Sequence, residues 1–444
     1  MIRPKRGRPY AQFRKGGRER RPGFPESFLP HRPRVPIDLT LALFGLLVLV
    51  LGLFSRAIKG RFPISDSLIA LAVGILVGPS VAGWLDLREL AEPERILHEA
   101  ARVTLAIGLM AIALRLPKRA LSIHRFTLAT LMLVVMPLMW LTSSALAWLI
   151  LGPPVLVALL IGAVLTPTDP VVASTIVTSQ LAKDVLPDRI RHTISAETGL
   201  NDGLAALFVF LPILLIEKPP AEAMGKWLST TVLHEVVGAI VFGIVFGYLA
   251  GKILEWAERR DLVESEGFLA YTIALAFASL GVAALLGTNE ILAVFITGIA
   301  FDHVVDAGER AEESKVQETM NQFFAIPIFS LLGLALPWGE WRALGWSGIA
   351  FAVAVLVLRR LPAVWLMRGQ LRSLRSAHEV LFFGWFGPIG VSTLLYVLLA
   401  MKETGEGSLW PITTLVICSS VVAHGVTASA LTRKLGAEEA GRAE

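Results

Sequence analysis

Long apolar runs separated by short polar connections dominate the chain. A helix needs roughly 17 to 25 apolar residues to span a bilayer, and about thirteen runs approach that length. The runs lie at 38–57, 64–80, 98–116, 126–151, 154–178, 190–216, 229–256, 267–287, 289–303, 322–337, 347–369, 378–400 and 409–432. They are continuous and do not alternate over about ten residues, so the pattern predicts an all-α integral membrane protein and not a β-barrel.

Composition supports a membrane domain at 37–432, flanked by two polar segments. Hydrophobic residues make up 54% of the 444 residues and charged residues only 17%, whereas soluble domains have about 25% charged residues. Residues 1–36 carry eleven Lys or Arg and few large aliphatic residues, which predicts a disordered basic tail and no signal peptide. Residues 433–444 form a short tail, and the single cysteine, Cys418, excludes an intrachain disulfide framework.

Basic residues in the connections predict the orientation of the chain. Among the connections, most Lys and Arg lie on one side, at 58–63, 117–125, 179–189, 257–266, 304–321, 370–377 and the C-terminal tail. The opposite connections, such as 151–153, 217–228, 287–288 and 401–408, are nearly free of them. Because basic connections favour the cytoplasmic side, we expect the C-terminal tail to be cytoplasmic. With thirteen spans the N-terminal tail would lie outside. Its charges make contact with anionic lipid headgroups a better interpretation than nucleic-acid binding.

Two of the predicted spans are interrupted at their centres. Pro167 and Pro170 flank Asp169 in the fifth span, and Gly387-Pro-Ile-Gly390 lies in the middle of the twelfth. Proline breaks a helix, and unwound backbone at membrane depth is tolerated only where it is buried or lines a cavity. The two spans are seven apart, so they occupy matching places if spans 1–6 and 8–13 are repeats around a linking seventh span. Interrupted helices at matching positions indicate the ion site of a secondary transporter.

Two aspartates lie at membrane depth, Asp169 in the fifth span and Asp202 in the motif Ser195-Ala-Glu-Thr-Gly-Leu-Asn-Asp-Gly203 of the sixth. Intramembrane carboxylates are costly and usually functional. Burial raises the pKa of a carboxyl group, so a proton and a cation can compete for one carboxylate. The candidate oxygen ligands of a transported sodium ion are those of Asp202, Asp169, Asn201, Thr198 and Thr168. The alternative is a structural polar pair that joins two helices.

Glu197 has a different predicted role. It precedes Asp202 by five residues, which is about 140° around a helix, so we expect it to face elsewhere. Arg359 and Arg360 also lie within an apolar run. A buried acid and a buried base tend to pair, so Glu197 with Arg359 or Arg360 is predicted to be a structural ion pair. The alternative is that one arginine extends to the membrane interface.

These motifs resemble the monovalent cation:proton antiporter-1 family, the sodium/proton exchangers, and in particular the fungal-type plasma-membrane antiporters. Thr166-Pro-Thr-Asp-Pro170 and the Asn201–Asp202 pair are similar to the family's broken-helix aspartate and Asn-Asp motif. The resemblance runs in order from about residue 40 to 430. Three further stretches carry it: Ala113-Leu-Arg-Leu-Pro-Lys-Arg-Ala120, Leu358-Arg-Arg-Leu-Pro-Ala-Val364 and Gly384-Trp-Phe-Gly-Pro-Ile-Gly-Val391.

The resemblance implies an inverted-repeat antiporter fold of about thirteen helices, with the broken fifth and twelfth helices crossing. It also implies a homodimer in which a core domain moves against a dimerisation domain. Three positions depart from the pattern of many relatives. Ile389 replaces an arginine, Ala111 stands where an acidic residue is usual, and Thr198 replaces a serine but keeps the hydroxyl.

The sequence therefore predicts a multi-pass protein of the cell membrane that exchanges sodium or lithium for protons by alternating access, with no enzymatic activity and no cofactor. Asp202 is the main proton or cation carrier. Potassium/proton exchange is the alternative within this class. A cation channel and an intramembrane aspartyl protease are less consistent with the sequence, since the Tyr-Asp and Gly-x-Gly-Asp motifs of that protease class are missing.

Overall fold

The computed structural model describes residues 65–89, 92–262, 267–305 and 311–443, with Ala42, Gly45, Leu46 and Leu49. Every regular element within these residues is helical. The elements are α2 (Asp66–Val77), η2 (Leu87–Glu89), α3 (Pro93–Arg115), α4 (Ala120–Ile123), α5 (Arg125–Thr130), η3 (Leu131–Val135), α6 (Met136–Leu151), α7 (Val155–Val164), α8 (Pro170–Val177), α9 (Gln180–Val185), α10 (Asp188–Glu217), α11 (Pro220–Lys226), η4 (Trp227–Val237), α12 (Gly238–Glu258), α13 (Gly267–Leu285), α14 (Glu290–Val305), α15 (Ala311–Leu334), α16 (Trp338–Leu358), α17 (Leu361–Leu366), α18 (Ala377–Trp385), α19 (Val391–Thr404) and α20 (Leu409–Ala443).

The membrane-length helices coincide with the predicted apolar runs. Seven stretches among the described residues are long and apolar enough to cross a membrane: Pro93–Arg115, Arg125–Leu151, Asp188–Glu217, Pro220–Glu258, Phe268–Leu285, Trp338–Leu366 and Leu409–Glu438. Three apolar helices are shorter, namely Asp66–Val77, Val155–Val164 and Phe323–Leu334. The predicted tail 1–36 lies outside the described residues, as does most of the first predicted run, 38–57.

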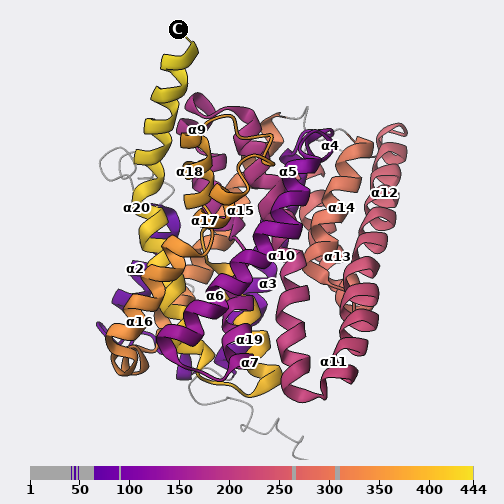
Figure 1. Cartoon of the computed structure of the whole chain (residues 1–444). Coiled ribbons are helices and arrows are strands. Elements are labelled where there is room, and N and C mark those ends of the chain that lie inside the picture. The colour runs from indigo at the N-terminus through magenta and orange to yellow at the C-terminus, as the bar shows by residue number, and fades with distance from the viewer. Residues whose placement is uncertain are drawn as a thin grey trace, which may run out of the picture.

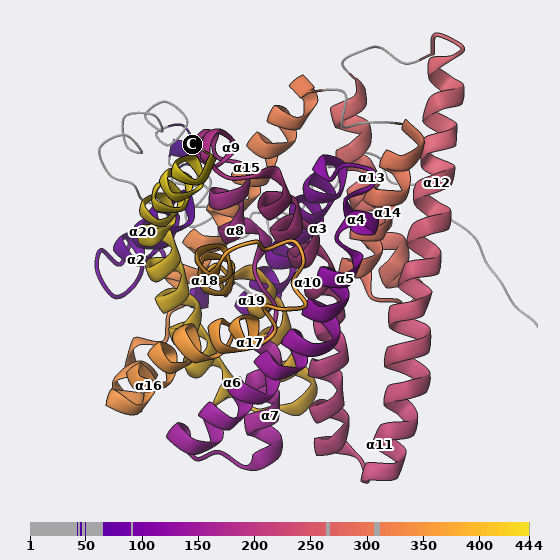
Figure 2. The same cartoon turned by 45° about the horizontal axis from the view of Figure 1, so that its top comes forward.

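Helix α10 lies in the interior of the bundle and contacts many of the other helices. It packs against α7, α8, α14 and α19, and both views show it surrounded by other helices, with α12 at the periphery (Figure 1, Figure 2). Many of its side chains are buried, including the charged ones of Glu197 and Asp202. A helix that is buried on several sides can hold polar groups out of contact with lipid.

The two ends of the bundle carry the connections in the grouping that the charge pattern predicts. Helices α4 and α9 lie at the same end as the C-terminus, and α11 lies at the opposite end (Figure 1). Residues 117–125 and 179–189 therefore share the C-terminal end, as expected for one side of a membrane. The assignment of that side as cytoplasmic stays a prediction.

Small residues allow α12 and α14 to pack at close range. A Cβ at Gly243 or Gly251 would lie within 3 Å of side-chain atoms of Ile296 or Val304, and one at Gly247 would overlap the carbonyl oxygen of Thr297. Spacing of small residues by four places them along one helix face, which is the usual means of close helix packing in membranes. This contact supports α14, which in turn packs on α10.

We expect Gly247→Ala to lower the thermal unfolding midpoint of the purified protein in detergent. The added methyl group overpacks the α12–α14 contact, which costs about 1–3 kcal/mol. Gly281→Ala in α13 is the matched control, because a Cβ there meets no atom within 4 Å. Equal unfolding midpoints for the two variants would contradict the close packing.

Candidate functional site

The first broken span is interrupted where two prolines remove backbone donors. Helix α7 ends at Val164 and α8 begins at Pro170, the first helical position, where a missing N–H does no harm. The preceding residue, Asp169, is the N-cap of α8, and its Oδ1 accepts hydrogen bonds from the backbone N–H groups of Val171 at 2.7 Å and Val172 at 2.9 Å. The carboxylate thereby satisfies two donors that the helix start leaves free.

The second broken span meets the first at this same aspartate. The N–H of Asp169 donates to the carbonyl oxygen of Pro388 at 2.8 Å, and the N–H of Val391, at the start of α19, donates to Asp169 Oδ2. One carboxylate therefore caps two helix N-termini, whose positive dipole ends favour a negative charge. A Cβ at Gly390 would overlap Asp169 Oδ2, which explains why glycine is needed there.

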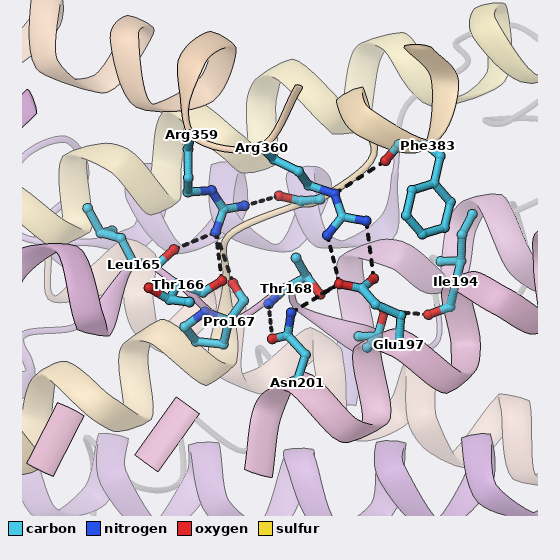
Figure 3. Close-up of polar contacts among 12 residues, drawn as sticks. Leu165, Thr166, Pro167, Thr168, Ile194, Glu197, Asn201, Arg359, Arg360 and Phe383 are labelled. Atoms are coloured by element: carbon cyan, nitrogen blue, oxygen red, sulfur yellow. Dashed lines mark hydrogen bonds and ion pairs between the residues drawn. The ribbon is translucent and has the colours of Figure 1, made fainter. Parts of the chain in front are cut away.

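Arg359 holds the two interrupted backbones together. Its guanidinium donates to the carbonyl oxygens of Leu165, Thr166 at 3.1 Å and Pro167 at 3.2 Å in the first break, and to that of Gly387 in the second. Figure 3 shows these bonds converging on one buried side chain. A buried carbonyl needs a donor, and this arginine supplies several to backbone that no helix can satisfy.

Glu197 pairs with Arg360. The carboxylate accepts from the Arg360 guanidinium at 2.7 and 3.2 Å, and each side chain is 2% exposed. Arg360 also donates to the carbonyl of Phe383 at 3.3 Å and lies 4.8 Å from the centre of its ring. The sequence left Arg359 and Arg360 as equal partners for Glu197. The structure assigns Arg360, while Arg359 bonds to carbonyl groups (Figure 3).

Asn201 lies with Glu197 and not on a separate face. Its Nδ2 donates to Glu197 Oε1 at 3.0 Å, and its Oδ1 accepts from the backbone N–H of Thr168 at 2.9 Å (Figure 3). The predicted division of the helix, with Asn201 facing the ion and Glu197 facing away, therefore differs from the structure. The two residues are four apart, so they share a helix face, and the amide ties α10 to the first break.

The two candidate threonines are buried beside this network. The hydroxyl of Thr168 donates to Glu197 Oε1 at 3.4 Å, and that of Thr198 donates to the carbonyl of Ile194 in its own helix at 2.8 Å. A hydroxyl that donates its proton keeps lone pairs that can face a cation.

Asp202 differs from every other charged group of the site. Its side chain is 0% exposed, and among the described residues neither carboxylate oxygen has a hydrogen-bond partner. The carboxylate of Asp169 is close enough to interact with it electrostatically. Buried polar atoms are nearly always satisfied, and an unpaired buried carboxylate is costly. The arrangement therefore provides oxygen lone pairs that a proton or a cation can occupy.

Tyr396 is a site residue that sequence reasoning missed. Its hydroxyl donates to the backbone carbonyl oxygen of Asp202 at 2.6 Å, which joins α19 to α10. In the sequence it lies within the apolar run Leu394–Leu399, where a tyrosine is most simply interpreted as a side chain that packs in the hydrophobic interior. The only signal was its position one turn into the helix that follows the Gly-Pro-Ile-Gly break.

Comparison with known proteins places the chain among exchangers. Residues 45–434 match the family model described as "Sodium/hydrogen exchanger, transmembrane". The chain is 30% identical over 412 residues to Na(+)/H(+) antiporter 2 of Zygosaccharomyces rouxii, covering 86% of this chain and 51% of that protein. It is 29% identical over 423 residues to the Na(+)/H(+) antiporter of Saccharomyces cerevisiae, covering 88% and 43%. The chain thus spans about half the length of these relatives.

Other similarities concern a second cation and the fold. The K(+)/H(+) antiporter NhaP2 of a Shewanella strain is 24% identical over 371 residues, covering 82% of this chain and 61% of that one.

The solved structure of the sodium proton antiporter MjNhaP1 from Methanocaldococcus jannaschii at pH 8 superposes with a TM-score of 0.68 at 21% identity, covering 90% and 99% of the two chains. The chain therefore shares the all-helical fold of this antiporter.

We expect Arg360→Met to lower the unfolding midpoint strongly, since leaving a buried partner charge unpaired costs about 3–5 kcal/mol. Adding Glu197→Gln removes that charge and should restore part of the loss. Arg359→Met should also destabilise the protein, but Glu197→Gln should not compensate it, because the lost partners are carbonyl groups. Thermal unfolding of the four variants in detergent tests this, and rescue of Arg359→Met by Glu197→Gln would contradict the assigned partners.

Proposed function

The chain belongs to the family of transmembrane sodium/hydrogen exchangers, and on this premise we propose that it is a secondary-active antiporter that exchanges sodium or lithium for protons by alternating access. As in other members of that family, the protein is a multi-pass membrane protein and a transporter, not an enzyme. The observation that carries the proposal is the Asp202 carboxylate, which is fully buried and unpartnered within the described structure.

Competition for this one carboxylate is sufficient to couple the two ions. A bare charge at membrane depth is costly, so Asp202 moves between the two sides of the membrane only when a proton or a cation neutralises it. Both ligands use the same oxygens and therefore exclude each other. Each cycle then carries a cation in one direction and protons in the other, and the two movements are obligatorily linked.

The surrounding groups fall into two sets, the oxygen ligands of the cation and the charged groups with a structural role. We assign Asp169, Thr198 and Thr168 as further oxygen ligands of the cation, with Asn201 positioning the Thr168 backbone through its hydrogen bond. The two helix N-termini at Asp169 donate to its carboxylate and offset part of the cost of burying its charge. Glu197 and Arg360 neutralise each other and are assigned a structural role.

Potassium is the alternative cation, and the relative named as a K(+)/H(+) antiporter keeps it open. Ile389 stands in the Gly-Pro-x-Gly segment where many exchangers have arginine, and its backbone N–H donates to Ser420.

We further propose that the protein works as a homodimer in the cell membrane, without a cofactor.

We expect Asp202→Asn to abolish cation-driven proton movement in proteoliposomes while the protein remains folded. The amide cannot be deprotonated, so it offers no charge for which a cation and a proton compete. Proton flux is followed with a pH-sensitive dye after a sodium jump, and the unfolding midpoint reports folding. Asp184→Asn, at an exposed position of α9, is the control and should exchange normally. Normal exchange by Asp202→Asn would refute the carrier assignment.

The same assay identifies the transported cation. Sodium, lithium and potassium are added in turn to proteoliposomes that contain the unaltered protein. We expect dye responses with sodium and lithium and a much weaker one with potassium. A response to potassium alone would replace sodium/proton exchange with potassium/proton exchange. Proton flux without any added cation would indicate a channel.

A further inference from the structure

Two hydroxyl groups in the first turn of α19 have no structural explanation so far. Ser392 is 1% exposed and Thr393 is 0% exposed. Within the described part of the chain, neither hydroxyl makes a hydrogen bond. Leaving a buried polar group unsatisfied is costly, so an unsatisfied hydroxyl calls for a cause.

Ser392 lies between the two aspartates of the site. Its neighbour Val391 donates a backbone hydrogen bond to Asp169 Oδ2. Tyr396, four residues further along α19, donates to the carbonyl oxygen of Asp202. Residues four apart share a helix face, so the face that carries Ser392 is the one directed at Asp202.

The hydroxyl of Ser392 is also close to the Asp202 carboxylate. The two side chains are close enough for the Ser392 hydroxyl to donate a hydrogen bond to the Asp202 carboxylate, although no such bond has formed with ordinary geometry in this structure. Three buried oxygen atoms from two helices, Oδ1 and Oδ2 of Asp202 and Oγ of Ser392, therefore lack hydrogen-bond partners in the same small region. A group of unsatisfied oxygens is what a desolvated cation requires.

We infer that Ser392 is a ligand of the transported cation, so that α19 supplies one wall of the site together with α10. The inference rests on the proposed antiport function and adds a residue to it. The positive N-terminus of α19 by itself would repel a cation, and a hydroxyl oxygen presents a lone pair at that position. A proton on Asp202 forms a covalent O–H bond that needs at most one acceptor, whereas a cation needs several oxygen ligands, so Ser392 contributes to cation affinity more than to proton affinity.

This role has a mechanical consequence. A cation held by both Asp202 and Ser392 bridges the central helix and the second broken span, in addition to the bond from Tyr396. A protonated Asp202 is joined to α19 by the Tyr396 bond and at most one hydrogen bond. The two loaded forms therefore differ in how tightly α10 and α19 are linked, as expected for ligands that act on an alternating-access equilibrium.

The test is the Ser392→Ala variant in proteoliposomes, measured as sodium-driven proton flux. We expect the apparent KM for sodium to rise about tenfold or more, the scale of losing one polar contact to a charged group. The maximal rate and its pH dependence at saturating sodium should stay unchanged. Ser392→Thr keeps the oxygen and should recover most of the affinity.

Ser143→Ala is the matched control. Ser143 in α6 is 0% exposed, and among the described residues its hydroxyl likewise has no hydrogen-bond partner. The substitution makes the same chemical change at a hydroxyl that belongs to no helix of the site. Its KM for sodium should equal that of the unaltered protein.

Two results would overturn the inference. One is that Ser392→Ala, like Ser143→Ala, leaves the KM for sodium unchanged. The other is a shifted pH profile with an unchanged sodium KM at high pH, which would show that Ser392 acts on the proton of Asp202.

The proposed function is judged separately, by exchange in the unaltered protein and its loss in Asp202→Asn. If no exchange is seen with sodium, lithium or potassium, calorimetric titration of the purified protein with sodium at high pH still decides the role of Ser392. Weaker binding by Ser392→Ala than by Ser143→Ala supports it, and equal binding or no binding by the unaltered protein overturns it.

Discussion

Two unwound backbone segments cross inside the bundle, and their carbonyl and N–H groups have to be satisfied away from water. The side chains of Arg359 and Asp169 do most of this. Arg359 donates to carbonyl groups of both breaks, and Asp169 accepts N–H groups from the starts of both α8 and α19. Each backbone group left without a partner would cost several kcal/mol in a lipid-like interior. The crossing, and hence the site, depends on these two side chains.

Two of the three buried acids at the crossing face a positive partner. Glu197 is neutralised by Arg360, and Asp169 faces two helix N-termini. Asp202 has neither an ion-pair partner among the described residues nor a helix terminus capped by its side chain. A buried network of satisfied hydrogen bonds is rigid, and the one carboxylate outside it is free to take a ligand. Structural stability and ion binding are thus assigned to different acids on the same helix.

The breaks could be predicted from local chemistry. Pro167, Pro170 and Pro388 cannot donate backbone hydrogen bonds, so helices must stop near them whatever surrounds them. Apolar run length fixed the other helix positions in the same way, because a span must match the thickness of the membrane. The pairing of Glu197 with an arginine was also predictable, since both are too costly to bury alone.

The amino-acid sequence by itself thus determined the helices, the two interruptions and the acidic residues at membrane depth, because each depends on residues close together in the chain. The tertiary structure decided which partners these residues have. Arg359 and Arg360 are adjacent between α16 and α17, yet one donates to carbonyl groups and the other to Glu197, because different elements pack against each of them. Tyr396 and Ser392 were invisible as site residues, because their contacts with α10 join segments almost 200 residues apart, and helical periodicity gives a side chain's angle but not its neighbour.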